Sequence, residues 1–284
     1  MNFLYFFAGP IAFITRPIYN LVHNYGLTLI VVTIIVKLLT IPFTIMSQKN
    51  VAKTQLIQPE LQKLQYKYRN DKNMLSIEMQ KLYRKYDVNP LGGCLPLILQ
   101  MFILFGFIRV VYDPLTHILQ IPSGQIKELL ALGGSGSQVG ACGVKEVVDA
   151  IKSMGYTPIN FDFLGIDLTK MLKGNESDIL LWIFPVLATI TTFLSSYISK
   201  KQMEKSKKEE TSKYRNEKGE QAQNMSNTMM KIMPVITAIF TYTMPVGMSL
   251  YWFVSTAVQL IQQTVLTNVI NKKIKLEMES KIKK

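Results

Sequence analysis

The feature that most restricts the fold of this chain is a run of 40 residues, 232–271, without a single Asp, Glu, Lys or Arg. An α-helix rises about 1.5 Å per residue, so such a run is about 60 Å long as helix and could cross a hydrocarbon core of about 30 Å twice. Met244-Pro245-Val246-Gly247 lies where a turn between the two crossings would fall. The run therefore predicts a pair of membrane-spanning helices.

Three other apolar segments are long enough to cross a membrane, at residues 26–46, 91–112 and 179–199. With the pair at 232–246 and 247–268 they make five predicted transmembrane helices. The predicted fold class is therefore all-α: a polytopic membrane helix bundle of five transmembrane helices with a cytoplasmic helical hairpin. An odd number of crossings places the two termini on opposite sides of the membrane.

Basic residues are unevenly distributed among the segments that flank the predicted spans. Residues 47–90 carry nine basic and four acidic side chains, the loop 200–231 carries nine and five, and the tail 269–284 carries six and two. The segment 113–178 instead carries five basic and eight acidic side chains. Because Lys and Arg accumulate in cytoplasmic loops, the N-terminus is predicted outside and the C-terminus in the cytoplasm. This topology accounts for most of the net charge of +13, so no DNA partner is predicted.

The first 25 residues are predicted to form an interfacial segment on the outer surface of the membrane. Gly9-Pro10 interrupts their apolar run and Arg16-Pro17 ends it, which leaves it too short for a span. Without a basic start or an Ala-x-Ala site it does not read as a cleaved signal peptide, and an uncleaved signal-like element is the alternative. The expected interfacial anchors are Tyr5, Phe6, Phe7, Phe13 and Tyr19.

The cytoplasmic segment 47–90 predicts a helical hairpin. Its arms are expected at 48–68 and 73–86, with a break at Asn70-Asp71. A solvated connector is the alternative interpretation, although the segment is longer than a connector needs.

The other two connecting segments are less regular. The extracytoplasmic loop 113–178 is expected to contain a short amphipathic helix over 144–154 and a strand or interfacial segment over 159–168. The Lys/Glu-rich residues 200–228 have no apolar periodicity and are predicted to be disordered or loosely helical.

Lys37 is the residue that most directly suggests a function, because it lies near the middle of the first predicted span. A lysine at mid-membrane costs at least about 2.5–3.5 kcal/mol, and none of the predicted spans contains Asp or Glu. A water-filled cavity is the favoured environment, with snorkelling toward the membrane surface as the alternative. Polar residues in the spans that could line it are Thr33, Gln100, Thr191, Ser255 and Gln259; an ordinary interhelical hydrogen bond is the alternative role for each.

The sequence shows no machinery for hydrolytic chemistry. It has no phosphate-binding G-x-x-x-x-G-K-[ST] motif and no Ser-His-Asp set within the spans. The two cysteines and two histidines have no ligand-spaced companions. The protein is therefore predicted not to be an enzyme and to need no metal or cofactor.

Several motifs together resemble the YidC / Oxa / Albino membrane protein insertases in their short, five-span bacterial form. The most specific is Asn89-Pro90-Leu91-Gly92-Gly93-Cys94-Leu95-Pro96. Asn24-Tyr25-Gly26-Leu27-Thr28, Gln58-Pro59-Glu60-Leu61 and Met244-Pro245-Val246-Gly247-Met248-Ser249-Leu250-Tyr251-Trp252 are also similar. Lys37 stands where the family usually has Arg, and Phe102 stands where it commonly has Pro. Lys37 keeps the positive charge but lacks the bidentate guanidinium fork.

The resemblance implies a function, which the residues alone do not. Members of the family insert or help to fold nascent membrane proteins in the bacterial plasma membrane, without ATP, through a hydrophilic groove. On this basis the groove is expected to include Trp252 with the six polar residues above. The implied partners are nascent membrane proteins, the lipid bilayer and the Sec translocon, and the basic tail suggests ribosome contact. The competing classes are a small channel or transporter with an anion site at Lys37 and a structural scaffold of the Sec machinery.

Overall fold

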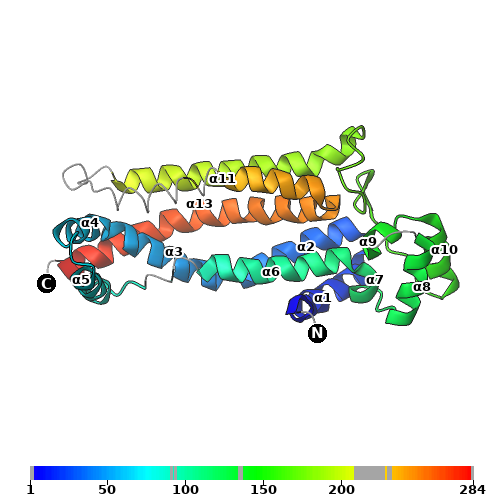
Figure 1. Cartoon of the computed structure of the whole chain (residues 1–284), viewed down its shortest axis with the longest axis horizontal. Coiled ribbons are helices and arrows are strands. Elements are labelled where there is room, and N and C mark those ends of the chain that lie inside the picture. The colour runs from blue at the N-terminus through cyan, green and yellow to red at the C-terminus, as the bar shows by residue number, and fades with distance from the viewer. Residues whose placement is uncertain are drawn as a thin grey trace. The chain divides into compact units, whose positions relative to one another are not determined.

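A computed structural model describes residues 3–89, 92, 95–133, 137–207, 228 and 232–282. The described chain is mostly helical, as predicted, and its only strands are one pair of two residues each (Figure 1). It divides into two compact units. The first unit comprises Met1–Leu38, Leu99–Thr192 and Val235–Val258, and the second comprises Leu39–Ile98, Phe193–Pro234 and Gln259–Lys284.

Long helices form most of the first unit. They are α1 (Phe3–Val22), α2 (Tyr25–Leu39), α6 (Leu95–Tyr112), α11 (Ile183–Lys207) and α13 (Val246–Ile282), of which α2, α6, α11 and α13 extend into the second unit. A further apolar helix covers Ile232–Thr243. The buried side chains of the unit form one hydrophobic cluster, and Tyr25, Leu29 and Phe107 are among its fully buried members.

The first helix corrects the expectation that Pro10 and Pro17 break the N-terminal segment, because α1 continues through both. A proline removes one backbone hydrogen bond, and packing can hold the remaining turns in place. Here Phe7 stacks on Phe102 of α6 with ring centroids 4.7 Å apart. Gly106 lets the backbone of α1 approach closely, since a Cβ atom there would meet the Phe7 carbonyl oxygen at 2.5 Å.

One face of α1 is buried and the opposite face is exposed. Ala8, Ala12 and Thr15 are almost fully buried, whereas Phe6 and Phe13 are each 79% exposed. The predicted anchor Tyr19 lies on the buried face, 5% exposed, and its hydroxyl accepts a hydrogen bond from the Asn160 backbone N–H at 3.1 Å. Tyr19 is therefore a packing residue, and of the predicted anchors Phe6 and Phe13 are available to a membrane surface, as is Leu21 at 83% exposed.

Short elements between α6 and α11 fold into an outer module of the first unit. They are α7 (Pro114–His117), α8 (Ser123–Gly133), α9 (Gln138–Ala141), α10 (Lys145–Ser153), β1 (Asp162–Phe163), β2 (Ile166–Asp167) and the 3-10 helix η1 (Ile179–Trp182). The amphipathic helix predicted over 144–154 is confirmed as α10, with Val147 and Ile151 buried. The segment 159–168 contains the antiparallel pair β1–β2. The turn at Pro245 is anchored here, because the Val246 and Gly247 N–H groups donate to the carbonyls of Lys170 and Leu168.

The second unit contains the helical hairpin. Its helices are α3 (Ile41–Leu56), α4 (Gln58–Lys67) and α5 (Lys72–Lys85), and α4 and α5 pack as the two arms (Figure 1). The second arm agrees with the prediction, and Asp71 caps it by accepting from the Met74 N–H at 2.9 Å. The first arm was predicted as one helix over 48–68, which is wrong: α3 ends at Leu56 and α4 restarts next to Pro59, which cannot donate a backbone hydrogen bond.

The first predicted span, 26–46, is also not one straight helix. The axis bends by 53° between α2 and α3, around Thr40. Pro42 explains the break, because it cannot donate to the carbonyl of residue 38 and its ring would clash there. Lys37 was expected about ten residues from either end of the span, but it lies in the last turn of α2, just before this bend.

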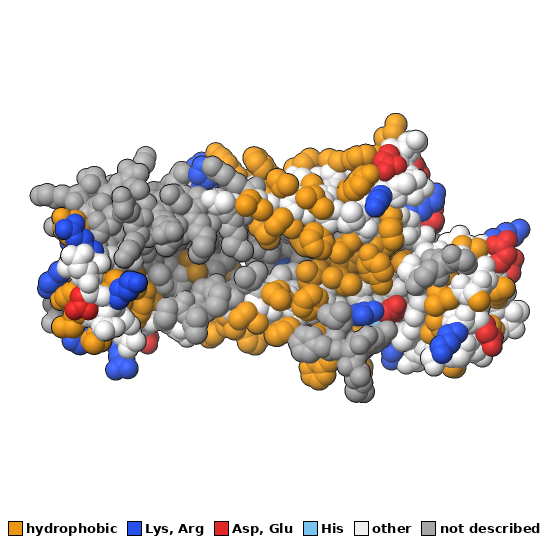
Figure 2. Space-filling model, viewed as in Figure 1, with side chains coloured by type: hydrophobic (Ala, Val, Ile, Leu, Met, Phe, Trp, Pro, Cys, Tyr) orange, Lys and Arg blue, Asp and Glu red, His pale blue; other side chains and the backbone are white. Residues whose placement is uncertain are grey.

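The five membrane crossings stay a prediction. Within the described residues, Ile179–Lys201 is long and apolar enough to cross a membrane alone, and the bent pair Tyr25–Leu39 and Ile41–Leu56 qualifies together. Ile98–Tyr112 and Ile232–Thr243 are shorter apolar helices. Figure 2 shows hydrophobic side chains gathered along the long helices of the first unit and charged ones over its outer module, as a membrane protein requires. Pro90, Leu91, Gly93, Cys94, most of the loop 200–231 and the end of the tail lie outside the described residues.

Candidate functional site

Lys37 is buried inside the first unit, with 6% of its surface exposed. The flanking residues of α2 are apolar, and the helix dipole favours a cation in the last turn, where Lys37 lies. Its Nζ atom donates a hydrogen bond of 3.0 Å to Oε1 of Gln100 on α6. A carboxamide accepts this bond without bringing a negative charge, so the contact positions the lysine.

The contact continues through Gln100 to α13. Nε2 of Gln100 donates to the Tyr251 hydroxyl at 3.2 Å, and the same hydroxyl shares a hydrogen bond with the Ser255 side chain. The ring of Tyr251 stacks on Phe107 with centroids 4.2 Å apart, which fixes the hydroxyl beside Gln100. Three helices, α2, α6 and α13, thus place one lysine and three neutral polar groups together in an apolar interior. We call these residues, Lys37, Gln100, Tyr251 and Ser255, the lysine cluster.

The other predicted groove residues lie elsewhere in the first unit. The Thr33 hydroxyl is buried and donates to the Leu29 carbonyl of its own helix at 2.6 Å. The Thr191 and Thr256 hydroxyls bond each other at 2.7 Å and join α11 to α13. Trp252 faces the helix Ile232–Thr243, where its ring lies 6.2 Å from that of Phe240.

Gln259 belongs to the second unit. Of the seven predicted site residues, the structure brings Lys37, Gln100 and Ser255 together. The membership of all seven in a substrate groove stays a prediction.

Tyr251 is the member of the cluster that the sequence analysis missed. Residues four apart lie on the same face of a helix, so Tyr251 and Ser255 share a face whereas Trp252 is turned away from it. This spacing, applied to the predicted Ser255, could have found Tyr251 in place of Trp252. The described residues contain no group of three or more His, Cys, Asp or Glu side chains that could hold a metal ion.

Comparison with known proteins identifies the family of this chain. A family model described as "60Kd inner membrane protein" matches residues 17–273. The chain belongs to this family. The prediction of a YidC / Oxa / Albino family member is thereby confirmed.

Named relatives agree with this assignment. "Membrane protein insertase YidC" of Fusobacterium nucleatum subsp. nucleatum is 28% identical over 253 residues, 89% of this chain and 91% of the relative. The protein of the same name from Wolinella succinogenes is 25% identical over 272 residues, 96% of this chain but 39% of the relative. That of Syntrophus aciditrophicus is 41% identical over 110 residues, 39% of this chain and 20% of the relative. Relatives therefore include proteins of similar length and much longer ones.

Proposed function

We propose that this protein is a membrane protein insertase and chaperone that moves transmembrane segments of nascent proteins from the cytoplasm into the bilayer without ATP. Family membership and the names of the relatives support an insertase. The observation that carries the mechanism is the lysine cluster, a buried ammonium held by a neutral carboxamide between three helices. Substrate tails would enter a hydrophilic groove around this cluster, to which Thr33, Thr191, Trp252 and Gln259 would also contribute.

The energetics explain why no nucleotide is required. An apolar substrate span of about 20 residues gains on the order of 6–12 kcal/mol on entering lipid. The barrier is the polar tail, since one carboxylate at mid-membrane costs about 2.5–3.5 kcal/mol. A lysine 4 Å from that carboxylate contributes roughly 4 kcal/mol at an effective dielectric constant of about 20, before desolvation costs. The two energies are similar, so Lys37 can offset the barrier for a tail with one acidic residue.

The proposed function also includes a membrane topology and two partners. The N-terminus lies outside and the C-terminus in the cytoplasm, with the hairpin α4–α5 and the loop 200–231 on the cytoplasmic side. The six basic side chains of the tail 269–284 suit the phosphates of ribosomal RNA. The Sec translocon is the other proposed partner.

Insertion by the purified protein tests the proposal. Proteoliposomes would receive a single-span substrate with a short acidic tail, and protease protection of the tail would measure its translocation. We expect protection with this protein and not with protein-free liposomes. A channel or transporter would instead make the vesicles permeable to anions, and a scaffold would do neither. Absence of protection with a correctly folded protein would overturn the proposal.

A further inference from the structure

The second unit contains an open pocket of about 830 Å³ between α3 and the end of α5. Its described lining is rich in cations, with Lys49, Lys53 and Arg84 against one acidic residue, Asp87. The neutral lining residues are Met46, Asn50, Gln80, Tyr83, Val88 and Asn89. A volume of this size is in the range of small-molecule sites and exceeds the needs of a single inorganic anion.

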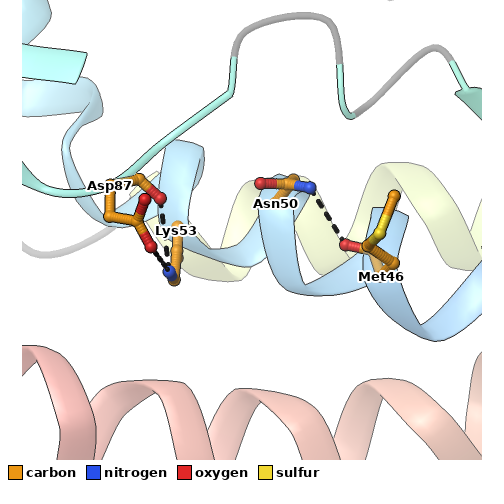
Figure 3. Close-up of polar contacts among 4 residues, drawn as sticks. All are labelled: Met46, Asn50, Lys53 and Asp87. Atoms are coloured by element: carbon orange, nitrogen blue, oxygen red, sulfur yellow. Dashed lines mark hydrogen bonds and ion pairs between the residues drawn. The ribbon is translucent and has the colours of Figure 1, made fainter. Parts of the chain in front are cut away.

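A lysine–aspartate contact builds one side of the pocket. Nζ of Lys53 donates to both the backbone carbonyl and the carboxylate Oδ2 of Asp87, each at 3.2 Å (Figure 3). Both oxygens are in reach because Asp87 adopts a left-handed conformation, φ 51°, directly after α5 ends. The contact ties α3 to the C-terminal end of α5, and it uses the only carboxylate among the described lining residues.

Lys49 and Arg84 are the other two cations of the pocket, and both side chains are exposed. Within the described part of the chain, neither forms an ion pair with an acidic side chain. The described residues of the pocket therefore leave two positive charges without an acidic partner, which favours an anionic ligand.

The face of α3 that lines the pocket changes from apolar to basic along its length. Phe43, Met46, Asn50 and Lys53 follow one another at spacings of three and four residues, which is one side of a helix. Phe43 is 48% exposed and Met46 is 50% exposed, and Met46 itself lines the pocket. Asn50 does not interrupt this face, because its Nδ2 donates to the Met46 carbonyl of its own helix (Figure 3). An apolar strip thus leads directly into a cationic pocket.

We infer that this pocket binds an anionic phospholipid, with the phosphate between Lys49 and Arg84 and an acyl chain along Met46 and Phe43. A free phosphate ester would satisfy the cations but would leave the apolar strip unused. An acidic peptide would match the charge, but the polarity gradient of α3 fits a molecule with a charged head and a long apolar tail. The inference does not depend on the proposed insertase activity.

Native mass spectrometry of the full chain in detergent tests the site directly. The protein would be given equal amounts of phosphatidylglycerol and phosphatidylcholine with identical acyl chains. We expect preferential retention of phosphatidylglycerol, and we expect Lys49→Gln with Arg84→Gln to weaken it on the order of tenfold. The matched control is Arg69→Gln with Lys72→Gln, which removes the same charges from exposed positions of the same hairpin outside the pocket.

Three results would overturn the inference. Equal losses in the two double variants would mean that hairpin charge, and not this pocket, attracts the lipid. Full displacement of the lipid by an equal concentration of soluble glycerol phosphate, with no effect of Met46→Ser, would identify a free phosphate ester as the ligand. Binding of an acidic peptide that depends on Lys49 and Arg84, without lipid preference, would identify a peptide site. Loss only in the pocket variant, together with weaker retention in Met46→Ser, supports the lipid.

Discussion

Two lysines, Lys37 in the first unit and Lys53 in the second, each donate a hydrogen bond to a side chain of another segment in the same unit. The partner of Lys37 is neutral, whereas the partner of Lys53 carries a negative charge. Lys37 is buried and bonds a neutral carboxamide at 3.0 Å. Lys53 bonds a carboxylate at 3.2 Å whose side chain is 84% exposed. Water and salt screen the exposed pair, so it contributes little energy and fixes mainly the geometry of the hairpin. In the interior, Gln100 brings no charge of its own, and a charge there acts strongly on an incoming ion.

The largest expected effect concerns how well the first unit excludes solvent from its buried cysteine. Cys142 is buried in the outer module, and burial raises the pKa of its thiol to about 12. Only the thiolate reacts, so near neutral pH a maleimide should label Cys142 on the order of a thousandfold more slowly than an exposed cysteine. The rate should rise as the pH is raised toward 12.

The matched control is Leu164→Cys, at a side chain that is 78% exposed in the same module. With an impermeant maleimide on intact cells, we expect this cysteine to react and Cys142 to react only after unfolding. Equally fast labelling of both cysteines in the folded protein would show that the outer module is open to solvent. The interior of the first unit would then be no better protected from water than the hairpin of the second.

The second prediction tests the charge of the buried lysine. Lys37→Arg should keep the insertion of acid-tailed substrates, whereas Lys37→Ala and especially Lys37→Glu should lose it, by up to the roughly 4 kcal/mol of one close ion pair. Substrates with neutralised tails should depend little on this residue. Proteoliposome insertion of both substrates measures the difference. If Lys37→Ala supports both as well as the unmodified protein at equal incorporation, Lys37 has no role in insertion.

The third prediction separates folding from function at Gln100. Gln100→Leu removes an acceptor from a buried ammonium and should lower the free energy of unfolding by about 1–3 kcal/mol. Gln100→Glu supplies a carboxylate to Lys37, so it should keep stability while insertion of acid-tailed substrates falls. Thermal unfolding in detergent and the insertion assay measure the two effects. Full insertion by Gln100→Glu would contradict an electrostatic role of Lys37 in the insertion of acid-tailed substrates.

The smallest effect is expected for the exposed pair. A double-mutant cycle with Lys53→Met and Asp87→Asn should give a coupling energy of about 0.2–1 kcal/mol that declines as salt is added. Asn is the suitable replacement because it tolerates the left-handed backbone of position 87. Chemical unfolding of the four proteins measures the coupling. The contact of Lys53 would be the stronger of the two if its coupling energy exceeded the loss in unfolding free energy caused by Gln100→Leu.

Much of the helical structure, and the central residue of the site, could be predicted from local sequence patterns. The uncharged run 232–271 and the other apolar segments predicted helices in a membrane protein, and amphipathic spacing located α10 and α5. Lys37 was found because a single cation within an apolar segment is costly wherever that segment folds. These inferences succeeded because each depends on residues a few positions apart.

The tertiary structure decided which residues meet. Gln100 lies 63 residues from Lys37 and 151 from Tyr251, and no local pattern specifies either contact. The continuity of α1 through Pro10 and Pro17 depends on its packing against Phe102 and Gly106, which the composition of α1 does not contain. The sequence by itself determined a helical membrane protein with a lysine in its interior. The three-dimensional packing determined the partners of that lysine, because a buried polar group is satisfied by whichever donors and acceptors the fold places within about 3 Å.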